Sequence, residues 1–113
     1  MSFDYPARIS ALPHEQQLRF YELFAHNLTI AVRAIWDDLN LTDTQKVDQM
    51  KWMNEILHRV TAKIAVVRLH LHDWPETAFW AMIQHWVAQN RAIGGHVGWA
   101  IQTSYTALET IAE

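Results

Sequence analysis

Apolar residues recur every three or four positions along most of the chain, and short stretches rich in Pro, Gly, Asn and Asp interrupt this pattern. Such spacing gathers the apolar side chains on one face of an α-helix. The most regular stretch has spacings of 3-4-3-4-3-4 and consists of Met50, Met53, Leu57, Val60, Ile64, Val67 and Leu71. This heptad pattern predicts a helix that packs knobs-into-holes against a neighbour.

The pattern predicts four helices, at about residues 13–38, 43–70, 75–90 and 96–112. Pro13 suits the first turn of the first helix, because the missing backbone N–H costs nothing there. Thr42 and Gln45 have the spacing of a capping box at the start of the second helix. Residues 1–12 are expected to be irregular.

The three Pro and three Gly residues lie at or near the boundaries of these helices, which is typical of a helical protein. We therefore expect an all-α fold, with two long and two shorter helices in an antiparallel up-down four-helix bundle. The length of 113 residues suits a single domain, so residues 1–113 are assigned to one helical-bundle domain.

The unequal lengths of the predicted helices bear on the oligomeric state. The two long helices would each span roughly 40 Å and the two shorter ones roughly 25 Å, which leaves two turns or more of apolar surface uncovered. A second copy of the chain would cover it, and the six Trp residues suit an interface core. We therefore expect a homodimer. The alternative is that the N-terminal segment, with Phe3, Tyr5, Ile9 and Leu12, folds back over the gap.

Composition and charge narrow the classes of function. A net charge of −3 with dispersed Lys and Arg argues against a nucleic-acid-binding protein, which usually carries a basic stripe. The absence of Cys excludes disulfides, thiolate nucleophiles and Cys-based zinc sites. The sequence has no signal-peptide pattern and no long uninterrupted apolar run, so a cytoplasmic protein without a membrane span is expected.

Two pairs of residues are candidates for a metal site. Glu55 and His58 form a Glu-x-x-His step of the kind that binds metals in helical bundles, and Glu22 with His26 is the nearest second pair. Helical carboxylate-bridged sites need two such steps and two further Glu, whereas this chain has one step. Glu55 also lies four residues from Arg59, the spacing of a solvated ion pair. The pattern therefore favours an ordinary helix surface, and no metal or other cofactor is expected.

The segment RAIGGH, residues 91–96, resembles the Arg-x4-6-His motif of the HEPN ribonucleases, which are small all-helical proteins that usually dimerise. The resemblance implies that Arg91 and His96 from two subunits would cleave RNA. It covers six residues, and Ala92 stands where the family usually has a polar residue. The same loose spacing occurs twice more in the chain, so the motif does not identify a family.

Three hypotheses about function follow. The leading one is a non-enzymatic helical bundle that acts through protein–protein contacts, as a homodimer and with a further protein partner as an option. The competing class is an enzyme or ligand-binding protein whose polar site lies between the first three helices and uses His26, His58 or His85. The third is a HEPN-like ribonuclease.

Overall fold

The computed structural model describes residues 4–70, 76–91 and 95–112, and within these ranges the chain forms helices and no strand. In chain order the helices are α1 (Tyr5–Ser10), α2 (His14–Trp36), α3 (Asp43–Arg68), α4 (Glu76–Arg91) and α5 (His96–Ala112). The predicted all-α fold is confirmed. The four longer helices lie within two residues of their predicted bounds at each end, which is the ordinary uncertainty of a helix end.

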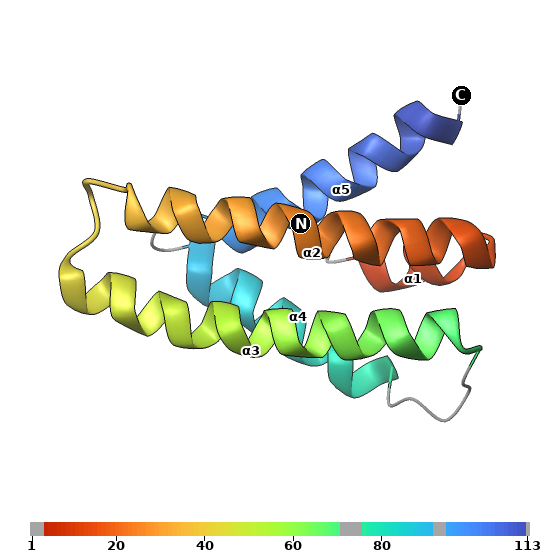
Figure 1. Ribbon diagram of the computed structural model, residues 1–113, viewed down its shortest axis with the longest axis horizontal. Helices are drawn as coiled ribbons and strands as arrows, with labels where there is room; N and C mark the ends of the chain where they lie inside the picture. Colours follow the sequence, from red (N-terminus) through yellow and green to blue (C-terminus); the bar gives the residue numbers. More distant parts are fainter. Residues whose placement is uncertain (1–3, 71–75, 92–94, 113) are drawn as a thin grey trace.

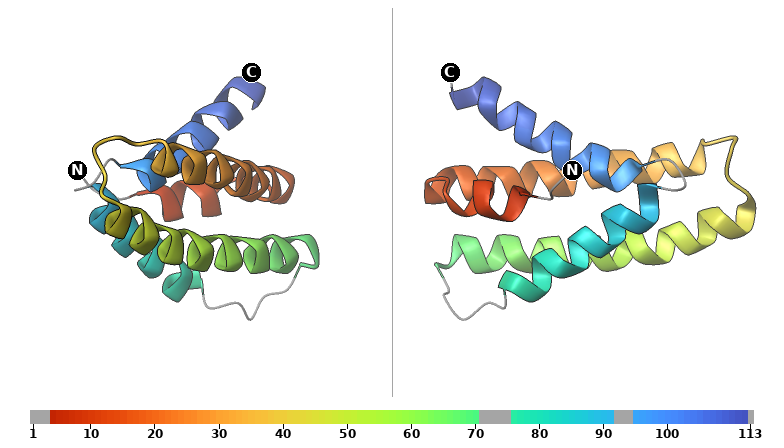
Figure 2. Two further views of the ribbon diagram at one scale, coloured as in Figure 1. Left: turned by 60° about the vertical axis from the view of Figure 1, so that its left-hand side comes forward. Right: turned by 180° about the vertical axis from the view of Figure 1, so that it is seen from behind.

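The four longer helices form two layers (Figure 1). Helices α2 and α3 lie antiparallel to each other in the front layer, with α4 behind α3 and α5 behind α2. Successive helices reverse direction, which is consistent with the predicted up-down bundle. Seen from behind, α4 crosses α3 obliquely, and the C-terminal half of α5 diverges from the other helices (Figure 2). Helix α2 is central because it packs against both α3 and α5.

The prediction of an irregular N-terminal segment is wrong for Tyr5–Ser10, which form α1. Pro6 lies in the first turn, where its fixed φ angle suits a helix. The Asp4 carboxylate lies 2.8 Å from the Arg8 guanidinium, and this ion pair spans one turn. The sequence pattern missed α1 because six residues are too few to display a helical period.

Helix α1 packs against the rest of the molecule. Ile9 is fully buried, and Tyr5 and Leu12 are partly buried against the core. The rings of Tyr5 and Tyr105 meet edge to face, with their centroids 5.8 Å apart, and this contact joins α1 to α5. Helix α1 therefore covers apolar surface of the core, but it lies at the end of the molecule away from the connection between α2 and α3 (Figure 1). Phe3 lies outside the described residues.

The predicted capping box at the start of α3 is confirmed. The Thr42 hydroxyl accepts a hydrogen bond from the Gln45 backbone N–H at 3.2 Å. In return, the Gln45 side-chain oxygen accepts one from the Thr42 backbone N–H at 2.9 Å. Two backbone donors that the first turn of a helix leaves unpaired are thus satisfied.

The buried face of α3 is rotated from the predicted stripe. Its buried residues are Gln49, Met53, Ile56, Val60, Lys63 and Val67. Three members of the predicted stripe, Met50, Leu57 and Ile64, are only partly buried, and Leu71 lies outside the described residues. The rotation arises because α3 contacts α2 on one side and α4 on the other, so its buried line lies between the two contacts.

A buried hydrogen bond joins α2 to α5. The Asn27 side-chain amide donates to the Ser104 hydroxyl at 2.9 Å, and that hydroxyl donates to the Ala100 carbonyl at 2.6 Å. Both side chains are buried, so the bond fixes the position of α5 along α2.

The predicted length mismatch is confirmed. Helices α2 and α3 have 23 and 26 residues, whereas α4 and α5 have 16 and 17. The connection between α2 and α3 extends past α4 and past the start of α5 (Figures 1 and 2). Three large apolar side chains are exposed there: Trp36 at 47%, Leu39 at 96% and Val47 at 49%. We call Trp36, Leu39 and Val47 the overhanging end.

Within residues 4–70, 76–91 and 95–112, none of the helices combines the length and the hydrophobicity that a membrane span requires.

Candidate functional site

The two Glu residues of the predicted metal pairs face Arg side chains. The Glu22 carboxylate lies 3.7 Å from the Arg68 guanidinium, between α2 and α3. The Glu55 carboxylate lies 3.0 Å from the Arg59 guanidinium, one turn further along α3. All four side chains are well exposed to solvent, so these are surface ion pairs of small energetic weight.

The three candidate His residues lie on three different helices. His26, His58 and His85 lie on α2, α3 and α4 respectively, and each is exposed. Among the described residues, no three His, Asp or Glu side chains gather in a group that could hold a metal ion. The hypothesis of a ligand-binding or catalytic site that uses His26, His58 or His85 stays a prediction.

His96, from the HEPN-like segment, is engaged with an acidic side chain. It begins α5, and its Nε2 lies 3.4 Å from the Asp38 carboxylate in the connection between α2 and α3. The hydrogen bond that the Asn40 backbone N–H donates to Asp38 lowers the pKa of that carboxyl, and His96 acts in the same direction. This pair ties α5 to the connection. The side chain of Arg91 lies outside the described residues.

The structure reveals a buried amine that the sequence analysis did not single out. Lys63 is 5% exposed, and its Nζ lies 5.6 Å from the ring centroid of Tyr21 and 5.9 Å from that of Phe79. Loss of hydration in this aromatic surrounding lowers the pKa of the amine to about 8. The sequence signal for its burial was its spacing of seven residues from Ile56, on the buried line of α3.

Tyr21 connects this amine to α4. Its burial raises the pKa of the phenol above the ordinary value of 10.0, and a hydrogen bond with the Trp80 side chain acts in the opposite direction. The Tyr21 and Trp80 ring centroids are 6.2 Å apart. Lys63, Tyr21 and Trp80 therefore form a small polar cluster within the apolar core between α2, α3 and α4.

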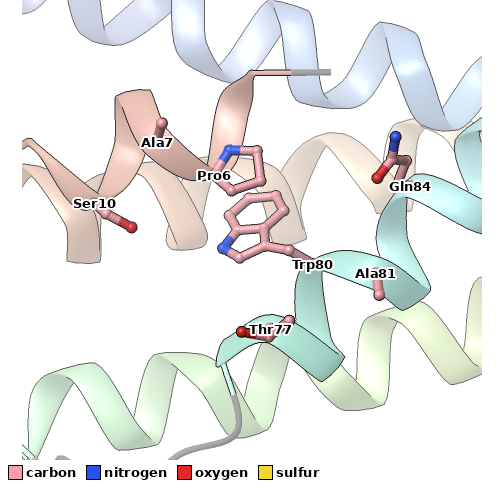
Figure 3. A pocket seen from close by; sticks show the side chains of 7 residues that line it. All are labelled: Pro6, Ala7, Ser10, Thr77, Trp80, Ala81 and Gln84. Atoms are coloured by element: carbon pink, nitrogen blue, oxygen red, sulfur yellow. The ribbon is translucent and has the colours of Figure 1, made fainter. Parts of the chain in front are cut away.

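Trp80 is buried, with 4% of its surface exposed, and it is one of the residues that line a groove of about 370 Å³ between α1 and α4 (Figure 3). The indole ring stands between the two helices, close to the ring of Pro6. The groove is lined by Pro6, Ala7, Ser10, Thr77, Trp80, Ala81 and Gln84. None of these side chains carries a charge. Sequence reasoning missed this site because α1, which supplies one wall, was expected to be irregular.

The charged side chain of Arg8, on α1, contacts other residues and does not line the groove. Arg8 pairs with Asp4, and its guanidinium carbon lies 6.0 Å from the ring centroid of Tyr5 and 5.7 Å from that of Tyr105. Arg8 is thus directed to the contact between α1 and α5, whereas Pro6, Ala7 and Ser10 line the groove toward α4. The groove remains an uncharged, mainly apolar site.

Comparison with known proteins finds no matching family model, no matching curated protein and no matching solved structure.

Proposed function

We propose that this protein acts through protein–protein contacts and that its working unit is a homodimer joined through the overhanging end. The observation that supports this proposal is the exposure of Trp36, Leu39 and Val47 at and beside the connection between α2 and α3. Burying one large apolar side chain is worth roughly 1.5–3 kcal/mol, so three exposed together are a source of association energy. Trp is also enriched at the centres of protein interfaces.

The polar groups beside the overhanging end suit an interface rim. The Lys46 ammonium donates to the Trp36 carbonyl at 2.8 Å, and the Arg33 guanidinium lies 3.2 Å from the Asp37 carboxylate. These charges have partners within the chain and would remain hydrated at the edge of a contact. An apolar centre with a polar rim is the usual anatomy of a protein interface. A two-fold axis at this end would bring the same patch of both copies together.

The first testable prediction concerns Leu39, the most exposed residue of the overhanging end. The wild-type chain is expected to sediment at twice its mass of 13.2 kDa. Leu39→Glu places an unpaired carboxylate in the interface twice, once from each copy, and should raise the dimer dissociation constant by at least about a hundredfold. Sedimentation equilibrium measures both masses, and far-UV circular dichroism checks that the variant remains helical.

The matched control is Leu69→Glu. Leu69 is 66% exposed and lies at the opposite end of α3, so the same substitution there should leave the dimer intact. A wild-type chain that remains a monomer at about 0.1 mM would rule out the homodimer. Dissociation by Leu69→Glu and not by Leu39→Glu would place the interface at the other end.

A further inference from the structure

We infer that Leu39 of one copy of the chain binds against the exposed side of α5 in the other copy, beside Trp99. This inference rests on the proposed homodimer and names the second surface of its interface. Trp99 is 44% exposed. A hollow of about 490 Å³ lies on this side of α5 and is lined by Trp99, Gln102, Thr103, Thr106 and Ala107, which we call the α5 face.

The overhanging end supplies less surface than a stable dimer needs. A fully buried aromatic side chain covers about 150–250 Å², so the exposed parts of Trp36, Leu39 and Val47 together offer on the order of 400 Å². A stable interface takes about 800 Å² from each partner and 20–30 residues on each side. The connection between α2 and α3 comprises only residues 37–42. The interface must therefore continue onto an adjoining surface.

The α5 face adjoins the overhanging end. His96 begins α5, and its Nε2 lies 3.4 Å from the carboxylate of Asp38, the residue before Leu39. Trp99 follows His96 by three residues, which is about one helical turn. Helix α5 packs against α2 and α4 through its buried side, which includes Ile101. A partner that binds the overhanging end can therefore extend onto the α5 face.

The absence of charge selects α5 over α3 as the adjoining surface. Residues 97–108 include no Asp, Glu, Lys or Arg. The exposed side of α3 also continues from the overhanging end, but it carries Asp48, Lys51 and Arg59. Charged residues are depleted at the centres of protein interfaces, where Trp is enriched. An apolar side chain of the partner, such as Leu39, is therefore better matched by the α5 face than by α3.

Two-fold symmetry makes the contact reciprocal, so that Leu39 of each copy lies against the α5 face of the other. Leu39 is 96% exposed and can enter the hollow without leaving any contact within its own chain. Interface hot spots are buried anchors in well-packed pockets, and Trp is among the commonest of them. The contact between Leu39 and Trp99 would therefore occur twice in each dimer.

Single-cysteine variants test this contact, because the natural chain has no Cys. Leu39→Cys protein labelled with ¹⁵N is mixed with unlabelled Thr103→Cys protein and oxidised with glutathione disulfide. Mass spectrometry then distinguishes mixed from self-linked pairs. The mixed pair is expected to form at least about tenfold faster than the pair of Leu39→Cys with Thr61→Cys, since a disulfide requires close approach of the two residues. Thr61 is an exposed residue of α3.

A charge on the α5 face gives a second measurement. Thr103→Glu should raise the dimer dissociation constant at least about tenfold, because its carboxylate would lose water against an uncharged partner surface. Thr61→Glu is the matched control and should leave the dissociation constant unchanged. Sedimentation equilibrium measures both. Far-UV circular dichroism checks their helicity, and if Thr103→Glu unfolds, the cross-linking of the two cysteine variants decides.

The outcomes separate this inference from the proposed homodimer. A dimeric wild-type chain whose Leu39→Cys variant forms only self-linked pairs, or no pairs, overturns the inference and leaves the homodimer standing. Dissociation by Leu39→Glu but not by a folded Thr103→Glu variant does the same. A monomeric wild-type chain overturns both.

Discussion

Lys63 carries an ionisable amine into the aromatic interior, and this sets a dependence of stability on pH. The pKa of the amine is about 8 in the folded chain and 10.5 ordinarily. Between these values the unfolded chain binds more protons than the folded chain. The free energy of unfolding therefore rises as pH increases through this window. Below pH 8 both states hold the proton, and burial of the charged amine opposes folding.

We predict that the free energy of unfolding of the wild-type chain gains about 2 kcal/mol from Lys63 between pH 8 and pH 10. Lys63→Met keeps an unbranched side chain and removes the titration, so this gain should disappear. Urea denaturation at pH 8, 9 and 10 measures it for both chains. The series stops at pH 10 because the raised pKa of Tyr21 makes stability fall above that value. Parallel pH profiles for the two chains would contradict the prediction.

The sequence does not reveal such a residue easily. Lys is almost never buried without a compensating environment, so a polar position at helical spacing is ordinarily assigned to the solvent face. The rings that surround Lys63 come from Tyr21 and Phe79, on two other helices. The contact between Lys63 and these two rings depends on how the three helices pack, which the sequence of α3 does not show. Glu55 shows the opposite case, because its ion pair with Arg59 is local and its spacing was sufficient to predict it.

At the scale of single helices, the start of α3 depends on one side chain. Thr42→Ala removes the hydroxyl that accepts from the Gln45 backbone N–H, and we predict a loss of about 1 kcal/mol in the free energy of unfolding. Thr44→Ala is the control, because Thr44 is exposed in the same turn and should change stability by less than about 0.5 kcal/mol. Thermal and urea unfolding measure both. Equal losses for the two variants would show that the cap contributes nothing.

The contact between α2 and α5 gives a second prediction at this scale. Ser104→Ala leaves the buried Asn27 amide without its acceptor and should reduce the free energy of unfolding by about 1–3 kcal/mol. Adding Asn27→Leu removes the unpaired amide as well, so the double variant should lose less than the sum of the single losses. Gln102→Ala, on the exposed side of α5, serves as the control. Additive losses would contradict a shared hydrogen bond.

The positions of the helices were predictable, whereas the faces they bury were predictable only in part. Boundaries follow from local signals such as Thr42 and Pro13, which act within a few residues. The buried face of a helix follows from its neighbours. On α3, Leu57 fits the apolar period better than Lys63 does, and yet Lys63 is the more buried of the two because α4 packs on that side. The spacing of apolar residues along α3 does not show on which side α4 will pack.

At the scale of the whole molecule, the overhanging end and the groove between α1 and α4 differ in how far the sequence predicts them. The overhanging end follows from helix lengths, and lengths follow from the spacing of apolar residues. The groove between α1 and α4 joins Ser10 to Thr77 across most of the chain. No local sequence pattern predicts that two residues so far apart in the chain line the same groove. The unequal helix lengths were therefore predictable, whereas the residues exposed at the overhanging end and the groove between α1 and α4 were found only in the fold.

The bond between Asn27 and Ser104 joins residues 77 positions apart, and this has a consequence for the chain during its synthesis. A ribosome adds about 5–20 residues per second, so Ser104 is made about 4–15 s after Asn27. Helices α2 and α3 can pair before that interval ends, because Arg68, the last residue of α3, precedes Ser104 in the chain and only a short connection separates the two helices. The apolar face of α2 that packs against α5 in the folded chain stays exposed until translation nears Ser104. A chaperone that recognises nascent apolar helices would find its substrate there.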